Sequence, residues 1–191
     1  MIETLSDWDT KFFLFLNQFH WDRLDPVIMF LTQTESWLPL FIFLIYMIIR
    51  EYKSESWLVL LCIIITIVLA DQITSSFMKP FFHRLRPSHV PALESLIHIV
   101  DGYRGGLHGF ASSHAANTTG VAFFIFLLFR EKHRLAWLIF IWAFIMSYTR
   151  IYLGVHYPGD VIVGALVGMA CSYAAYRIYH WGHRRRLARQ P

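Results

Sequence analysis

Apolar residues in this sequence are gathered into long uninterrupted blocks, and this pattern limits the fold more than any other feature. Four blocks have about the length that a helix needs to cross a bilayer: residues 57–77, 113–129, 135–152 and 161–181. A fifth block, residues 37–49, is shorter, but the stretch LDPVIMFLTQTES before it extends it back towards Leu24. Because the bilayer core offers the backbone no hydrogen-bond partners, such blocks must be helical. The pattern predicts an all-α polytopic membrane bundle with five transmembrane helices, the first irregular, and six as the alternative count.

The composition agrees with a membrane protein. Hydrophobic residues make up 56% of the 191 positions, above the share of about 45–50% in soluble domains. We find no repeat, low-complexity stretch or linker, so residues 1–191 are expected to form one membrane-embedded domain. Cys62 and Cys171 lie inside two of the apolar blocks and lack metal-site spacing, so we expect two buried free thiols.

The N-terminal segment lacks the features of a cleavable signal peptide. MIETLSDWDTKFF is acidic, with no basic region and no small-residue cleavage site. Residues 8–20 are instead amphipathic, with large apolar side chains at helical spacing from Trp8 to Phe19. They predict a helix that lies in the membrane interface, and an N-terminal helix packed on the bundle is the alternative.

Charges in the short connections predict the orientation. Arg50 and Lys53 lie in REYKSES, three cations lie in REKHR (130–134), and the end of the chain, HRRRLARQP, is strongly basic. Five spans place these segments, including the tail 184–191, on one side, which the positive-inside rule makes cytoplasmic. The opposite face holds the N-terminus, the loop 78–112 and the turn 153–160. That loop nevertheless carries four cations, which suggests an anionic ligand. The net charge of +4 comes largely from the tail, and we expect no nucleic-acid partner.

Three polar clusters border this outer face at the ends of four predicted spans. They are KPFFHRLRP (79–87), GFASSHAANTTG (109–120) and SYTRIYLGVHYPGD (147–160). Singly, their residues have ordinary interpretations: headgroup contacts for Lys79 and Arg86, a helix cap for Ser112 or Ser113, or snorkelling for Arg150. Together they supply cations, hydroxyls and a helix N-terminus, which are the groups that bind phosphate.

The two histidines in these clusters predict hydrolysis rather than binding alone. His156 precedes Asp160 by one helical turn, so the carboxylate can accept one ring N–H and orient the imidazole. His156 is therefore the candidate nucleophile and Asp160 its orienter. His114, beside the serines, is the candidate acid for the leaving group. A zinc site on these three residues is the main rival, but three converging cations would repel a metal, so we expect no metal and no cofactor.

The ordered motifs K-x6-RP, a Ser-x-His-type helix opening and R-x5-H-x3-D resemble the signature of the type 2 phosphatidic acid phosphatase superfamily. Here they are Lys79 to Arg86-Pro87, residues 111–114, and Arg150 to His156 and Asp160. The resemblance spans residues 79–160. Three positions depart from the usual pattern: Ala111 replaces proline, Ser113 replaces glycine, and Thr149 replaces the serine before the arginine.

The resemblance implies metal-independent dephosphorylation of a lipid through a phosphohistidine intermediate. It makes His156 the nucleophile, Asp160 its partner and His114 the general acid. Phosphate would be bound by five residues: Lys79, Arg86, Ser112, Ser113 and Arg150.

We therefore expect a lipid phosphatase of a bacterial inner membrane whose pocket opens to the outside, with a membrane lipid phosphate and the bilayer as partners. Undecaprenyl diphosphate, phosphatidylglycerol phosphate and the phosphates of lipid A all suit a basic outer pocket. The alternative is a lipid-phosphate binding or transport protein, which would use the same cations without needing His156 and Asp160. The sequence predicts no oligomeric state.

Overall fold

The computed structural model describes residues 2–187, and their regular secondary structure is helical apart from one isolated bridge between Leu85 and His108. The helices are α1 (Ile2–Asn17), α2 (Asp25–Leu31), α3 (Leu38–Tyr52), α4 (Ser56–Asp71), α5 (Lys79–Phe82), α6 (Ser113–Phe129), α7 (Ile139–Tyr152) and α8 (Pro158–Leu187). The predicted all-α class is therefore confirmed.

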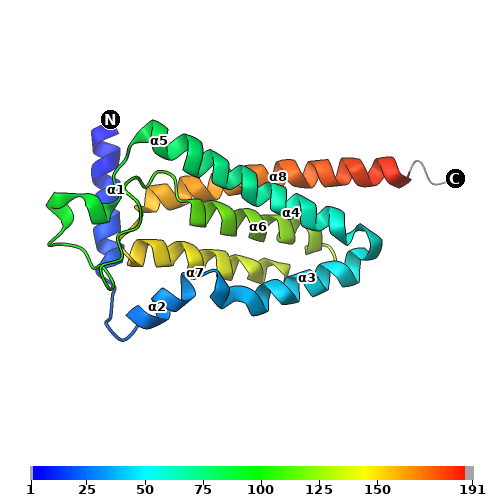
Figure 1. The fold of residues 1–191 in the computed structure, drawn as a ribbon, viewed down its shortest axis with the longest axis horizontal. Coiled ribbons are helices and arrows are strands. Elements are labelled where there is room, and N and C mark those ends of the chain that lie inside the picture. The colour runs from blue at the N-terminus through cyan, green and yellow to red at the C-terminus, as the bar shows by residue number, and fades with distance from the viewer. Residues whose placement is uncertain (1, 188–191) are drawn as a thin grey trace.

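The helices form an elongated bundle. Figure 1 shows α3, α4, α6, α7 and α8 running along the long axis, whereas α1 lies across one end. The long loop between α5 and α6 lies at that same end, near α1, and the connections from α3 to α4 and from α6 to α7 lie at the other. The basic segments 50–56 and 130–134 thus share one end with the final turns of α8. Residues 188–191 of the predicted tail lie outside the described residues.

The apolar blocks correspond closely to these helices. The block 113–129 coincides with α6, and the block 57–77 is α4 continued through a π-helical segment, Gln72–Met78. The extension of the first block towards Leu24 is interrupted, because α2 ends at Leu31 and α3 begins only at Leu38. Two described stretches, Glu35–Phe82 and Pro158–Arg185, are long and apolar enough to cross a membrane. The count of five spans, or six, stays a prediction.

Helices α6 and α8 pack backbone against backbone. A Cβ added to Gly164 would collide with the carbonyl oxygen of Ser112, and one added to Gly168 would collide with that of Ala116. On the α6 side, a Cβ at Gly120 would lie 3.0 Å from the carbonyl oxygen of Gly168. Gly164 and Gly168, which are four positions apart on α8, therefore allow close packing inside the bundle, as small residues do between membrane helices.

Helix α1 is attached to the bundle by one face. Phe13 is fully buried and lies edge-to-face on Tyr157, with ring centroids 5.5 Å apart. Asn17 donates from its amide nitrogen to the carbonyl oxygens of Ile151 and Tyr152 at 3.1 and 2.8 Å. The opposite face exposes a row of aromatic side chains: Trp8, Phe12, Phe15 and Phe19. The alternative of a helix packed on the bundle is therefore confirmed, whereas a position in the membrane interface stays a prediction.

The two cysteines are free and buried, as expected, with Cys62 in α4 and Cys171 in α8. Each packs in an apolar cluster between helices. They act as small hydrophobic side chains in the helix interfaces.

Candidate active site

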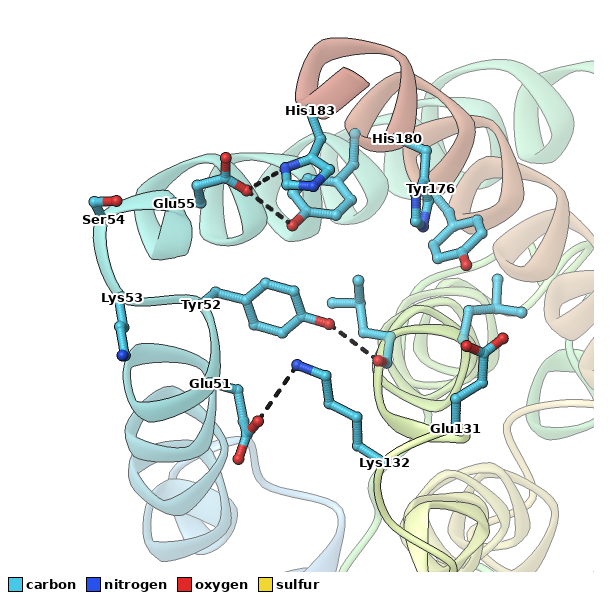
Figure 2. A pocket seen from close by; sticks show the side chains of 13 residues that line it. Glu51, Tyr52, Lys53, Ser54, Glu55, Glu131, Lys132, Tyr176, His180 and His183 are labelled. Carbon is cyan, nitrogen blue, oxygen red and sulfur yellow. Dashed lines mark hydrogen bonds and ion pairs between the residues drawn. The ribbon is translucent and has the colours of Figure 1, made fainter. Parts of the chain in front are cut away.

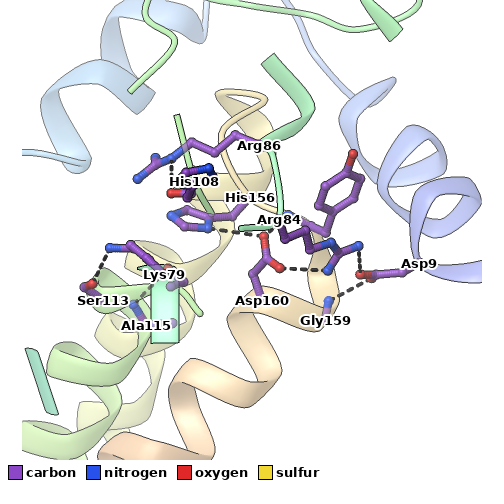
Figure 3. Close-up of polar contacts among 12 residues, drawn as sticks. Asp9, Lys79, Arg84, Arg86, His108, Ser113, Ala115, His156, Gly159 and Asp160 are labelled. Carbon is purple, nitrogen blue, oxygen red and sulfur yellow. Dashed lines mark hydrogen bonds and ion pairs between the residues drawn. The ribbon is translucent and has the colours of Figure 1, made fainter. Parts of the chain in front are cut away.

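The end of the bundle beside α1 brings the three polar clusters together. The loop that follows α5, the first turn of α6 and the turn from α7 into α8 meet there (Figure 3). One direct link is the backbone N–H of Ser112, which donates to the carbonyl oxygen of Asp160 at 2.9 Å. The residues that the sequence selected from 79 to 160 therefore occupy one site.

His156 and Asp160 form a buried pair at the start of α8. His156 is 1% exposed and Asp160 is 0% exposed. The Nδ1 atom of His156 lies 3.4 Å from Oδ2 of Asp160, and the same oxygen accepts the backbone N–H of Tyr157 at 3.0 Å. With Nδ1 facing the carboxylate, Nε2 is the ring nitrogen left to face a substrate.

Cations lie on the opposite side of the imidazole. Figure 3 shows Lys79 and the guanidinium of Arg86 on the side of the His156 ring that faces away from Asp160. Burial, together with Arg86, Arg150 and Lys79, holds the pKa of His156 well below its usual value of 6.5. The imidazole is therefore neutral at neutral pH, which is the form that a nucleophile requires.

Lys79 is held by hydroxyl groups. Its Nζ donates to Oγ of Ser113 at 2.7 Å and to Oγ of Ser75, one helical turn earlier, at 3.3 Å. The Ser113 hydroxyl also lies 3.0 Å from Oγ1 of Thr74. The ammonium group is thus directed to the first turn of α6, where the helix dipole also favours an anion.

Ser112 and Ser113 differ in their surroundings. Ser112 is the N-cap of α6, and its fully buried hydroxyl accepts the backbone N–H of Ala115 at 3.4 Å. Its side chain holds the helix start in place, whereas the Ser113 hydroxyl lies among Lys79, Ser75 and Thr74.

The two arginines of the motifs are almost wholly buried. Arg86 donates from Nε to the carbonyl oxygen of His108 at 3.1 Å, and a Cβ at Gly105 would lie only 2.5 Å from its Nη1. Burial and the neighbouring charge of Arg150 lower the pKa of Arg86 from its usual value. A guanidinium nevertheless stays protonated, since its pKa starts so high.

Arg150 is 1% exposed, and its guanidinium donates hydrogen bonds to two hydroxyl groups. Nη1 donates to Oγ1 of Thr32 at 2.6 Å, and Nη2 donates to the Tyr103 hydroxyl at 3.0 Å. Its Nε has no hydrogen-bond partner in the structure. A buried cation without a carboxylate partner is costly, which suits a site that an anion completes.

His114 stands in the first turn of α6, beside a large apolar cavity. That cavity has a volume of about 740 Å³. Its polar end is formed by Asp71, Ser113, His114, Asn117 and Thr118, and its walls are aliphatic and aromatic side chains of α3, α4, α6 and α7. The histidine is therefore placed between the cation cluster and an apolar chamber.

Sequence reasoning missed two residues that contact the site directly. Arg84 donates from Nη1 to Oδ1 of Asp160 at 2.7 Å and from Nη2 to Oδ2 of Asp9 at 2.7 Å. Arg84 lies inside the first cluster, residues 79–87, but it is not a position of the K-x6-RP motif. Asp9 belongs to the N-terminal helix, and nothing in its local sequence indicates a partner 75 residues away.

Among the described residues, no three His, Cys, Asp or Glu side chains are grouped as a metal ion would require. In this part of the chain, His114, His156 and Asp160 therefore do not form the ligand cluster that the zinc alternative requires.

A second cavity, of about 490 Å³, lies at the opposite end of the bundle. Figure 2 shows Glu55 hydrogen-bonded to His183 and Lys132 paired with Glu51. Glu55 also accepts a hydrogen bond from the Tyr179 hydroxyl at 3.3 Å. Glu51 and Glu55 each have a cationic or histidine partner there, whereas Arg150 has no carboxylate among its hydrogen-bond partners.

The comparisons with known proteins agree on one family. The family model described as the PAP2 superfamily matches residues 58–184. Lipid A 4'-phosphatase of Bacteroides thetaiotaomicron is 42% identical over 182 residues, which cover 94% of this chain and 80% of that protein.

Solved structures show the same fold. LpxE of Aquifex aeolicus superposes with a TM-score of 0.66 at 28% identity, covering 88% of this chain and 94% of that one. A transmembrane PAP2-type phosphatidylglycerolphosphate phosphatase of Bacillus subtilis superposes with a TM-score of 0.63 at 18% identity, covering 98% and 90%. The relationship to a lipid A phosphatase and the long apolar helices together indicate an integral membrane protein.

Proposed function

Because the chain belongs to the PAP2 superfamily and is a lipid phosphatase, we propose that it removes a phosphate from lipid A through a phosphohistidine intermediate. The observation that carries the proposal is the buried His156–Asp160 pair, with Lys79 and Arg86 on its far side and a large apolar cavity beside His114. A single site thus contains a nucleophile, an anion-binding site and a cavity that can hold a lipid tail.

The phosphate would bind against the first turn of α6. Lys79, Arg86 and Arg150 supply positive charge, and Ser113 supplies a hydroxyl, while Ser112 holds the helix N-terminus in register. These donors surround the equatorial oxygens, where negative charge grows in the transition state of phosphoryl transfer.

The reaction would proceed in two displacements at phosphorus. In the first, the Nε2 lone pair of His156 attacks, the bond from phosphorus to the lipid oxygen breaks, and His114 gives a proton to the leaving alkoxide. In the second, His114 takes a proton from water as that water attacks, and the phosphorus–nitrogen bond breaks to release inorganic phosphate. Asp160 stabilises the positive charge on the His156 ring throughout.

The tail of the substrate would lie in the 740 Å³ cavity. Its walls come from membrane-embedded helices, and Asn117 and Trp142 line it as well. A lipid could therefore enter sideways from the bilayer while its phosphate reaches His156.

Lipid A is favoured over undecaprenyl diphosphate and phosphatidylglycerol phosphate because the relative that is 42% identical is a lipid A 4'-phosphatase. We place the site at the outer face of a bacterial inner membrane, because the basic connections 50–56 and 130–134 lie at the other end of the bundle. Five spans, one domain over residues 1–191 and a cytoplasmic tail complete this proposal.

The test is phosphate release by purified protein from lipid A, undecaprenyl diphosphate and phosphatidylglycerol phosphate, each with and without excess chelator. Wild-type protein should release phosphate from lipid A fastest and should be insensitive to chelator. His156→Ala should release none, and acid-labile phosphate on the wild-type protein should disappear with it. Full release by His156→Ala would refute the phosphohistidine, and faster turnover of another lipid would refute the assigned substrate.

A further inference from the structure

We propose that Arg84 and Asp9 are positioning residues for catalysis, through which helix α1 holds the carboxylate that orients His156. The proposal rests on the proposed function, since it concerns the same reaction. Figure 3 shows the chain of contacts from Asp9 through Arg84 to Asp160 and His156.

Arg84 bridges two carboxylates with one planar group. Its Nη1 and Nη2 atoms each lie 2.7 Å from a carboxylate oxygen, one on Asp160 and one on Asp9. Both distances are typical of charge-assisted hydrogen bonds. Only a guanidinium presents two donors in such a fixed fork, so a lysine here could serve one carboxylate well but not both.

The contact with Arg84 fixes how the Asp160 carboxylate is turned. Oδ1 accepts from Arg84, which leaves Oδ2 to accept from Tyr157 N–H and to face Nδ1 of His156. Asp160 is 0% exposed, so in the intact site the donors to its carboxylate come from the protein and not from water. Without Arg84, this carboxylate would be free to rotate and would lose a stabilising charge, and the His156 ring would lose its orienting partner.

Asp9 completes the arrangement from the other side. Its Oδ2 accepts from Arg84, and its Oδ1 accepts the backbone N–H of Gly159 at 2.8 Å. Gly159 directly precedes Asp160, so Asp9 holds both the guanidinium and the first turn of α8. A Cβ at Gly159 would lie 2.6 Å from Oδ2 of Asp9, which shows how closely α1 approaches this turn.

The ring of Tyr157 contacts both Arg84 and helix α1. The guanidinium carbon of Arg84 lies 4.0 Å from the centroid of that ring, and Phe13 of α1 packs against it at 5.5 Å. Arg84 is thus confined between an aromatic face and two carboxylates. The position of α1 is therefore transmitted to Asp160 by packed and hydrogen-bonded side chains.

The test uses full-length protein in detergent and separates kcat from KM for lipid A. Asp9→Asn keeps an acceptor for Gly159 but loses the charge facing Arg84, and Arg84→Lys keeps the charge but loses the fork. Each should lower kcat about 10- to 100-fold, the cost of a misplaced catalytic group, with KM changed less than about threefold because neither residue touches the phosphate. Glu94→Gln, which breaks an exposed ion pair with Arg104 on the same loop, is the matched control and should keep wild-type kcat.

Two further measurements distinguish positioning from general damage. Arg84→Ala should regain activity when guanidinium ion is added, and the double variant Asp9→Asn/Arg84→Lys should be no slower than the slower single variant, because both changes break one unit. Wild-type kcat in both single variants, or multiplicative losses in the double variant, would overturn the proposal while phosphate release by wild type and its loss in His156→Ala still stood. If wild type released no phosphate from any lipid, the proposed function would fail instead.

Discussion

Adding one methyl group at Gly164 should destabilise the bundle and slow the enzyme, because α6 leaves no room for it. In Gly164→Ala, the new Cβ would collide with the carbonyl oxygen of Ser112, and it would lie 3.2 and 3.3 Å from the carbonyl carbon and amide nitrogen of that residue. These are backbone atoms of a helix start, so they cannot rotate away as a side chain could. Relief requires α6 and α8 to separate.

The size of the effect follows from two opposing terms. Overpacking costs about 1–3 kcal/mol, and a backbone neighbour places this site at the upper end. Alanine in place of glycine within a helix returns about 1 kcal/mol. The net loss of about 1–2 kcal/mol corresponds to a fall of about 2–8 °C in the melting temperature for a chain of this size. Activity should fall as well, since the Ser112 N–H bonded to the Asp160 carbonyl moves with α6.

The assay is thermal unfolding in one detergent, alongside the rate of phosphate release. Gly182→Ala is the matched control, because it lies on the same helix and its Cβ would meet only a Leu58 methyl at 3.9 Å. This control should melt at or slightly above the wild-type temperature. If Gly164→Ala melted no lower than Gly182→Ala and kept wild-type activity, the close packing of α6 on α8 would not be what holds the site together.

Three further predictions address the site itself. Between pH 7.5 and 5.5, the melting temperature of the wild type should fall more steeply than that of His156→Gln. The reason is that His156 becomes protonated near pH 6.5 in the unfolded chain, whereas buried His156 in the folded protein has a lowered pKa and stays neutral. Equal slopes for the two proteins would contradict this. Val121→Trp, which fills the apolar cavity, should raise KM for lipid A but leave hydrolysis of a short-chain, water-soluble phosphate ester unchanged. Arg150→Lys should lower kcat/KM at least about tenfold because an ammonium cannot reach Thr32, Tyr103 and a phosphate together, whereas Tyr103→Phe should have a smaller effect in the same assay.

Local sequence patterns predict many of the helices and several of the contacts in this protein. The apolar blocks predicted the helices because a bilayer leaves the backbone no other structure, and α6 matched its block residue for residue. The spacing of His156 and Asp160 predicted their pairing because four residues make one helical turn. Gly164 and Gly168 share one helix face for a similar reason, and both lie at the close contact with α6.

Only the tertiary structure decided the partners of single polar residues. Asp9 and Gly159 are 150 positions apart, yet they are hydrogen-bonded, and Arg150 meets Thr32 across 118 positions. The path of α1 across the end of the bundle was likewise beyond its own amphipathic pattern. Periodicity reports which face of a helix is buried, but it does not report what that face meets.

The sequence by itself therefore determined the membrane class, the helical blocks and the residues of the three motifs, because each depends on neighbours a few positions apart. The packing of α1, Arg84 and Asp9 around Asp160 depends on helices folding to one end of a bundle. The physical reason for this packing is the burial of the Asp160 carboxylate, because a buried charge requires a partner within hydrogen-bond distance. The fold supplies Arg84 as that partner.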